Sequence, residues 1–165
     1  MNHLATSKED ILAASRDLIK ENGWAAVSIR AVASRCSVSA GTIYNYYESK
    51  ADLLSDTIES IWHEIFFHPE DEQIFHDVES CISWIYERLE YGNRQFPGFF
   101  SLHSFGFMRD EKTSGKKRMM KTWGHILNEL CEVLGNDPKV RADVFDQEFT
   151  EKKFADILFS LILVS

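Results

Sequence analysis

Apolar residues recur at helical spacing along the whole sequence of 165 residues. Only three prolines interrupt the chain, and no series of short alternating runs with hairpin turns predicts a sheet. The length is sufficient to bury a core in one domain or in two small ones. We therefore expect an all-α fold.

Serine residues mark the beginnings of four predicted helices in the first third of the chain. A serine N-cap accepts a hydrogen bond from a backbone N–H of the first helical turn. Gly23 is suited to end the first helix in a left-handed conformation, and Pro69 is expected to stop the fourth. The predicted helices start after Ser7, Ser28, Ser39 and Ser49 and end near residues 22, 35, 46 and 68.

The remaining sequence contains four further apolar stripes joined by polar segments. We expect helices around residues 78–91, 96–108, 120–134 and 154–161, the second of them short and aromatic. A solvated loop is expected at residues 109–117. The last stripe reaches Ser165 without a capping residue, so we expect the C-terminal helix to be incomplete.

The second and third predicted helices are separated only by the tight turn "CSVS", residues 36–39. Two short helices joined in this way form a helix-turn-helix, whose second helix lies in the major groove of DNA. The side chains predicted to face the core are Ala33, Val38 and Ile43, and those predicted to face outward are Thr42, Asn45 and Tyr46. Asparagine can pair with adenine and threonine can contact the thymine methyl group. Tyrosine and serine hydroxyls donate to phosphates without adding charge.

Charge is distributed unevenly along the chain, whose net charge is -8. Residues 1–50 carry six Lys and Arg against five Asp and Glu, whereas residues 51–165 carry twelve against twenty-one. Attraction to phosphate is local, because charges are screened within about 10 Å at 0.1 M salt. An acidic body therefore does not prevent DNA binding by a separate head.

The segment "GWAAVSIRAVASRCSVSAGTIYNYYESKADLL", residues 23–54, resembles the DNA-binding segment of the TetR family of bacterial regulators. The resemblance extends from residue 7 to about residue 55. It implies DNA contacts, chiefly to phosphates and partly to bases. The predicted DNA-contacting residues are Ser28, Arg30, Ser39, Ala40, Thr42, Tyr44, Asn45, Tyr46 and Lys50.

Several positions depart from the usual pattern of that family. Ala40 and Asn45 stand where a basic residue is common, and Tyr46 stands where histidine is common. Ser37 replaces a frequent turn glycine, and a left-handed serine there costs about 1 kcal/mol. Tyr47 is expected to pack beneath the third helix. DNA binding by such a head should depend less on charge than DNA binding by its relatives does.

The resemblance also implies the organisation of the whole chain: a DNA-binding head at residues 1–50 and a helical effector-binding and dimerisation domain at residues 51–165. It implies a ligand-responsive regulator, a repressor, that binds a palindromic operator on double-stranded DNA as a homodimer. A small and largely apolar effector would enter a pocket lined by Trp62, Ile85, Tyr86, Leu89, Phe100, His103, Phe107, Trp123 and Leu127. The dimer would form through Phe154, Ile157, Leu158 and Leu161. The same apolar stripes also suit an ordinary core, and that alternative stays open.

Two other classes of function are alternatives to this interpretation. An enzyme is disfavoured, because no phosphate-binding loop, dinucleotide fingerprint or nucleophile motif is present. His63 and His68 lie five residues apart and diverge by about 140° on a helix, unlike the i, i+4 pair of a helical zinc site. No metal or cofactor is therefore expected, and Lys116, Lys117 and Arg118 are expected to be solvated. The second alternative is a helical protein–protein interaction module that has lost DNA binding.

The cysteines and the two ends of the chain indicate the cellular compartment of the protein. The three cysteines are isolated and odd in number, which disfavours a disulfide framework and favours a reducing cytosol. The start of the chain lacks the apolar segment of a signal peptide, and the last apolar stretch is shorter than the roughly 20 residues that span a bilayer. We expect a cytoplasmic protein.

Overall fold

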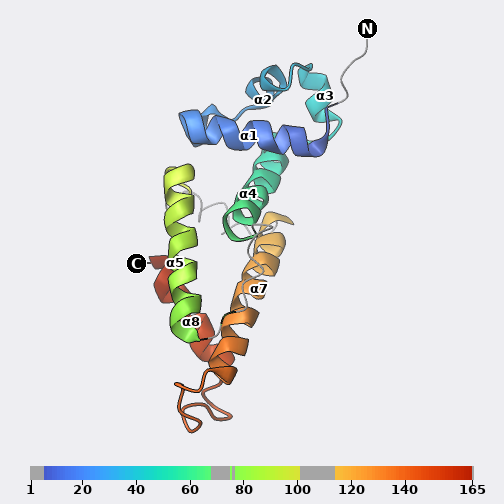
Figure 1. Ribbon diagram of the computed structural model, residues 1–165. Coiled ribbons are helices and arrows are strands. Elements are labelled where there is room, and N and C mark those ends of the chain that lie inside the picture. The colour runs from blue at the N-terminus through green and yellow to red at the C-terminus, as the bar shows by residue number, and fades with distance from the viewer. Residues whose placement is uncertain (1–5, 68–74, 76, 101–113, 165) are drawn as a thin grey trace.

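The computed structural model describes residues 6–67, 75, 77–100 and 114–164 (Figure 1), and the side chains of residues 114–122, 163 and 164 are not described. The regular structure of these residues is entirely helical, which confirms the all-α prediction. The helices are α1 (Lys8–Asn22), the 3-10 helix η1 (Trp24–Ala26), α2 (Ile29–Arg35), α3 (Ala40–Tyr44), α4 (Lys50–Phe66), α5 (Val78–Gln95), α7 (Ser114–Asn136) and α8 (Glu151–Val164). None of these helices has both the length and the apolar character that a membrane span requires.

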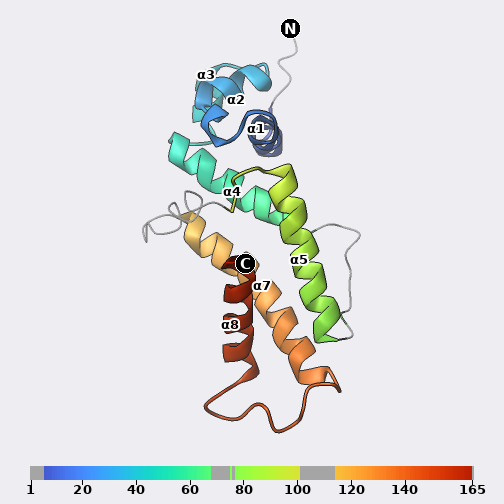
Figure 2. The same ribbon diagram turned by 90° about the vertical axis from the view of Figure 1, so that its left-hand side faces the viewer.

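The helices form a head and an elongated body. Figures 1 and 2 show α1, α2 and α3 gathered at one end of the molecule. Helix α4 starts in the head and runs into the body, where it packs against α5 and α7, and α8 packs against α7. The segment between α7 and α8 lies at the end of the body farthest from the head (Figure 1).

The four serine caps form as the sequence predicts. The Ser7 hydroxyl accepts from the Asp10 backbone N–H at 3.1 Å, and the Asp10 carboxylate accepts from the Ser7 backbone N–H at 2.8 Å. This is a complete capping box with aspartate in place of glutamate. The Ser7 hydroxyl also donates to the Asp10 carboxylate at 2.7 Å, and this bond first, then the one from the Ser7 backbone N–H, lowers the pKa of Asp10. The other three capping hydroxyls belong to Ser28, Ser39 and Ser49.

One continuous apolar core runs from the head into the body. Its head part includes Ile11 and Ile43, and its body part includes Trp62 and Leu130, all of them buried. Tyr47 is 3% exposed and packs in this core, which confirms its predicted place beneath the third helix.

Several helix boundaries differ from the prediction. Helix α3 ends at Tyr44, because the backbone N–H groups of Tyr46 and Tyr47 both turn back to the Ile43 carbonyl, at 3.0 Å each. Helix α4 ends at Phe66. Helix α7 begins at Ser114, inside the predicted loop, since the residues that follow Gly115 are mostly good helix formers. The predicted helix at 96–108 lies largely outside the described residues.

Helix α5 also continues past its predicted end, because Gly92 does not act as a cap. It lies inside the helix, buried against α4. A Cβ atom at this position would lie 2.6 Å from Cδ1 of Ile65. Gly92 therefore allows the backbone of α5 to approach α4 closely, which is a packing role rather than a terminating one.

Candidate nucleic-acid interface

The turn between α2 and α3 is held by backbone hydrogen bonds. The Val38 N–H donates to the Ala33 carbonyl at 2.9 Å, and the Ser37 N–H donates to the Ser34 carbonyl at 3.1 Å. These are the two bonds of a Schellman motif. Ser37 takes the left-handed position with φ 55°, where glycine is usual, as predicted. The strain is local and costs about 1 kcal/mol.

Helix α3 presents a short polar surface next to this turn. The Ser39 hydroxyl accepts from the Thr42 backbone N–H at 3.1 Å and lies 3.0 Å from the Thr42 hydroxyl. Ile43 points into the core, whereas Tyr44 is 55% exposed and Asn45 is also exposed. The exposed face is therefore an amide and a phenol, flanked by small hydroxyls, with no basic side chain on α3 itself.

The other predicted DNA-contacting residues lie around this face. Arg30, in the first turn of α2, is exposed, and so is Lys50, the first residue of α4. Ser28 is half-buried, and its hydroxyl accepts from the Ala31 backbone N–H at 3.1 Å. Ala40 is half-buried and packs against the core.

Tyr46 is placed differently from the other predicted contacts. Its side chain is exposed, but its hydroxyl donates to the Thr6 backbone carbonyl at 2.5 Å. A phenol has a single hydrogen to donate, so in this conformation the hydroxyl joins the start of α1 to the end of α3. Of the two exposed phenols, Tyr44 is the one oriented for an outside partner.

The predicted pocket residues divide between the body core and its surface. Trp62 is 1% exposed and makes edge contacts with Phe100 and Trp123, each at a ring-centroid distance of 5.6 Å. The indole nitrogens of Trp62 and Trp123 are buried without a hydrogen-bond partner among the described residues. The structure thus gathers three of the predicted aromatic side chains into one cluster.

The remaining predicted pocket residues differ in how deeply they are buried. Ile85 is fully buried, Leu89 and Leu127 are half-buried against the core, and Tyr86 is 45% exposed. His103 and Phe107 lie outside the described residues. The exposure of Tyr86 separates it from the aromatic cluster.

The predicted dimer residues lie on two faces of α8. Phe154 and Leu158 are half-buried and pack against the core of their own chain. Ile157 and Leu161 are 50% and 59% exposed. These two lie four residues apart, so they form one apolar strip on the outer face of the helix.

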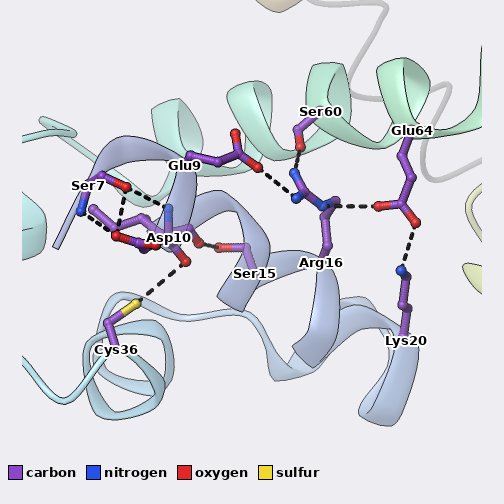
Figure 3. Close-up of polar contacts among 10 residues, drawn as sticks. Ser7, Glu9, Asp10, Ser15, Arg16, Lys20, Cys36, Ser60 and Glu64 are labelled. Atoms are coloured by element: carbon purple, nitrogen blue, oxygen red, sulfur yellow. Dashed lines mark hydrogen bonds and ion pairs between the residues drawn. The ribbon is translucent and has the colours of Figure 1, made fainter. Parts of the chain in front are cut away.

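Sequence reasoning missed a polar cluster between α1 and α4 (Figure 3). Glu64 on α4 accepts from Arg16 Nε at 3.1 Å and from Lys20 Nζ at 2.7 Å. Arg16 and Lys20 lie four residues apart, so two like charges share one face of α1, an arrangement that costs energy in an isolated helix. That like-charge pair was the available sign that a carboxylate faces α1.

The described residues contain no cluster of three or more His, Cys, Asp or Glu side chains arranged to hold a metal ion. His63 is exposed and stacks on Phe67 at a ring-centroid distance of 5.1 Å. His68, five residues further along the chain, lies outside the described residues.

Together, α2, the Schellman turn and α3 make this chain a helix-turn-helix protein with a helical body. Residues 11–57 match the family described as bacterial regulatory proteins, tetR family. The N-terminal segment of this chain is therefore similar to the DNA-binding region of the TetR family.

Curated relatives are similar in the same segment. The HTH-type transcriptional regulator UidR of Escherichia coli (strain K12) is 38% identical over 48 residues, which are 29% of this chain and 24% of the relative. The HTH-type transcriptional repressor KstR of Rhodococcus jostii (strain RHA1) is 45% identical over 47 residues, 28% of this chain and 22% of the relative. The match thus spans less than a quarter of the length of these curated relatives.

Solved structures share the fold over most of the chain. A TetR transcription regulator from Haloarcula marismortui ATCC 43049 superposes with a TM-score of 0.69 at 20% identity, covering 93% of this chain and 80% of that one. The regulator FadR from Bacillus subtilis, in complex with stearoyl-CoA, superposes with a TM-score of 0.64 at 21% identity, covering 96% and 84%. These likenesses extend the shared architecture from the head to the body.

Proposed function

We propose that this protein is a ligand-responsive transcriptional repressor that binds an inverted-repeat operator as a homodimer. The observation that carries the proposal is the exposed face of α3, held by its serine cap and by the Schellman turn within a TetR-family head. In a helix-turn-helix this face enters the major groove.

The side chains of the head divide between base and phosphate contacts. Asn45 and Thr42 are the proposed base-reading residues, because amide and methyl groups distinguish base edges in the major groove. Arg30, Tyr44 and Lys50 are the proposed phosphate contacts, since they surround α3 and can donate hydrogen bonds. Few of these proposed contact residues are cations, so the affinity for DNA should depend on salt less steeply than is usual for DNA-binding proteins.

The aromatic cluster of Trp62, Phe100 and Trp123 is the proposed wall of the effector site. Its rings suit a largely apolar molecule. The indole N–H groups of Trp62 and Trp123 have no partner among the described residues. They favour an effector that also carries a hydrogen-bond acceptor, because a buried donor without a partner costs free energy. One protein of similar fold is in complex with stearoyl-CoA, so long-chain acyl thioesters are the first compounds to test.

Regulation would follow from a shift between two head arrangements. Two α3 helices must be separated by one turn of the duplex or a multiple of it to occupy both half-sites. An effector that prefers another arrangement lowers DNA affinity by its differential affinity for the two states. Helix α4 joins the head to the aromatic cluster. We therefore propose that effector binding changes the position of the head through α4.

The test is selection from randomised DNA duplexes with the full-length protein, followed by sequencing of the bound fraction. We expect an enriched inverted repeat. Asn45→Ala should relax base preference at one position of each half-site, whereas Lys50→Ala should weaken binding to all sequences alike and reduce the salt slope by about one. No enrichment at low salt would instead support the interaction module, which the absence of basic residues on α3 favours.

A further inference from the structure

The head is joined to the body at two places. One is the region of the covalent connection, where the chain passes from α3 through residues 45–49 into α4 and where Lys8 of α1 pairs with Asp56 of α4 at 2.6 Å. The other lies at the opposite end of α1, where α1 and η1 contact the end of α4 and the turn that follows α5. Figure 1 shows the end of α5 reaching the head beneath α1.

The polar part of this second attachment centres on Glu64. Its carboxylate receives both Arg16 and Lys20 from α1 (Figure 3), and all three side chains are partly buried, with exposures of 16% for Arg16, 30% for Lys20 and 23% for Glu64. Partial burial reduces the screening that weakens ion pairs at a fully exposed surface.

Helix α5 fixes the backbone beneath that carboxylate. The Arg88 guanidinium donates to the carbonyls of Ile65 and Glu64, the latter at 3.3 Å. The Tyr91 hydroxyl lies 3.5 Å from Oε1 of Glu64. Glu64 is therefore anchored to the body while it receives the two cations of the head.

The aromatic part of the attachment lies beside the ion pairs. Trp24 of η1 stacks on Phe99 with ring centroids 5.8 Å apart and planes 13° from parallel. Lys20 Nζ lies 4.9 Å from the centre of the Phe96 ring. Phe99 in turn contacts Trp62 of the aromatic cluster at 5.2 Å, so the attachment borders the proposed effector site.

Helices α1 and α4 share part of the apolar core, and polar contacts join them as well. An open groove of about 710 Å³ runs between them, lined mainly by charged and polar side chains. A head held only by its covalent joint could turn on α4 across such a groove. The contacts of Arg16, Lys20 and Trp24 remove that freedom.

We propose that this second attachment sets the spacing between operator half-sites that the dimer accepts, with Glu64, Lys20 and Trp24 as positioning residues. The inference rests on the proposed function. One added base pair displaces a half-site by about 3.4 Å and turns it by about 35° around the duplex. A head fixed at two points tolerates that change less than a head fixed at one.

The test is a panel of duplexes that share one pair of half-sites and differ in spacing by one or two base pairs. Glu64→Gln removes the charge that receives Arg16 and Lys20, and Trp24→Leu removes the aromatic stack independently. The matched control is Glu21→Gln, which removes the negative charge that pairs with Arg35 at 2.6 Å, an ion pair that stays within the head.

We expect the unchanged protein to prefer one spacing. In Glu64→Gln and Trp24→Leu, the affinity ratio between the best spacing and its neighbours should fall about two- to fivefold, with base preference inside each half-site unchanged. Glu21→Gln should keep the original ratio. Circular dichroism confirms that each variant is folded before binding is measured.

Two results would overturn the inference. A folded Glu64→Gln or Trp24→Leu protein that loses affinity equally at every spacing would show that these residues stabilise the head without positioning it. Failure of the unchanged protein to bind any duplex would overturn the proposed function, and the inference with it. The first result leaves the proposed function intact, so the two failures are distinguishable.

Discussion

At the scale of single residues, Tyr44 and Tyr46 show that residue type alone does not determine which contact a side chain makes. Both are exposed phenols near the end of α3, and the sequence predicts the same phosphate contact for both. The structure separates them, because only Tyr46 reaches the Thr6 carbonyl. The fold of the preceding segment decides this, and no local pattern around residue 46 reports it.

Removing the Tyr46 hydroxyl should therefore affect stability more than direct DNA contact. Tyr46→Phe is expected to lower the free energy of unfolding by about 1 kcal/mol, the usual net contribution of one hydrogen bond. Tyr44→Phe, the matched control, should leave stability nearly unchanged and weaken operator binding. Urea denaturation and DNA titration of both variants provide the comparison. A stable Tyr46→Phe protein with weakened DNA binding would instead assign the Tyr46 hydroxyl to phosphate.

At the scale of helices, the sequence predicted where helices begin better than it predicted how they pack against one another. Each serine cap is recognisable because its partners lie two or three residues away. The role of Gly92 depends on Ile65 of another helix, and the Glu64 cluster joins residues more than forty positions apart. The contact at Gly92 leaves no trace in local spacing, which is why α5 was predicted to end early. The polar cluster left one local sign, the like-charge pair of Arg16 and Lys20, but that pair does not identify Glu64 as its partner.

Gly92 gives a prediction with an internal control. Alanine is a better helix former than glycine by about 1 kcal/mol. At Gly124 of α7 a Cβ would meet no atom of the described residues within 4 Å, so Gly124→Ala should raise stability by about that amount. At Gly92 the Cβ would collide with buried Ile65 and approach Cζ of Phe100 at 3.0 Å. Overpacking costs about 1–3 kcal/mol, so Gly92→Ala should be destabilising. Thermal melting of both variants measures the difference, and equal stabilisation would contradict the proposed close approach.

The start of α5 predicts a dependence of stability on pH. The Asp77 carboxylate caps α5 by accepting from the Ser80 backbone N–H at 2.8 Å, and it pairs with Lys139 Nζ at 2.9 Å. The backbone bond first, and then the lysine, hold the pKa of Asp77 well below its usual range. Because the folded-state pKa is depressed, this stabilisation is present above the unfolded-state pKa of about 3.9 and is lost as pH falls below it.

Asp77→Asn tests that dependence, since asparagine is also a good N-cap but does not titrate. We expect the unchanged protein to lose melting temperature more steeply than the variant between about pH 5 and pH 3. Asp143→Asn is the control, because the partner of Asp143 among the described residues is nearby Arg141, in an exposed segment. Parallel pH profiles for the unchanged protein and Asp77→Asn would refute a role for this carboxylate in acid sensitivity.

At the scale of the whole molecule, the head and the acidic body are two parts of different chemistry connected by α4. The sequence indicated this division through its charge distribution and its matching N-terminal segment. It could not indicate which apolar residues of α8 remain exposed, because Phe154, Ile157, Leu158 and Leu161 share the same helical spacing. Packing against α7, and for Phe154 also against Phe145 and Phe149, separates the buried members from the exposed ones.

The strip formed by Ile157 and Leu161 is the proposed contact between two copies of the chain. In a two-fold dimer the same residues face their own copies, so a charge placed there is repelled by its twin and buried without a partner. The double variant Ile157→Glu with Leu161→Glu should therefore be monomeric in sedimentation experiments while its melting temperature changes little. Its affinity for a full operator should fall towards that for a single half-site.

Lys152→Glu is the control for that double variant, because it adds negative charge to α8 at another exposed position. It should leave both the oligomeric state and operator binding unchanged. If the double variant stays dimeric, the two copies associate through another surface, and the exposed strip on α8 requires a different partner. If both variants become monomeric, the charge of the helix rather than its apolar strip controls association.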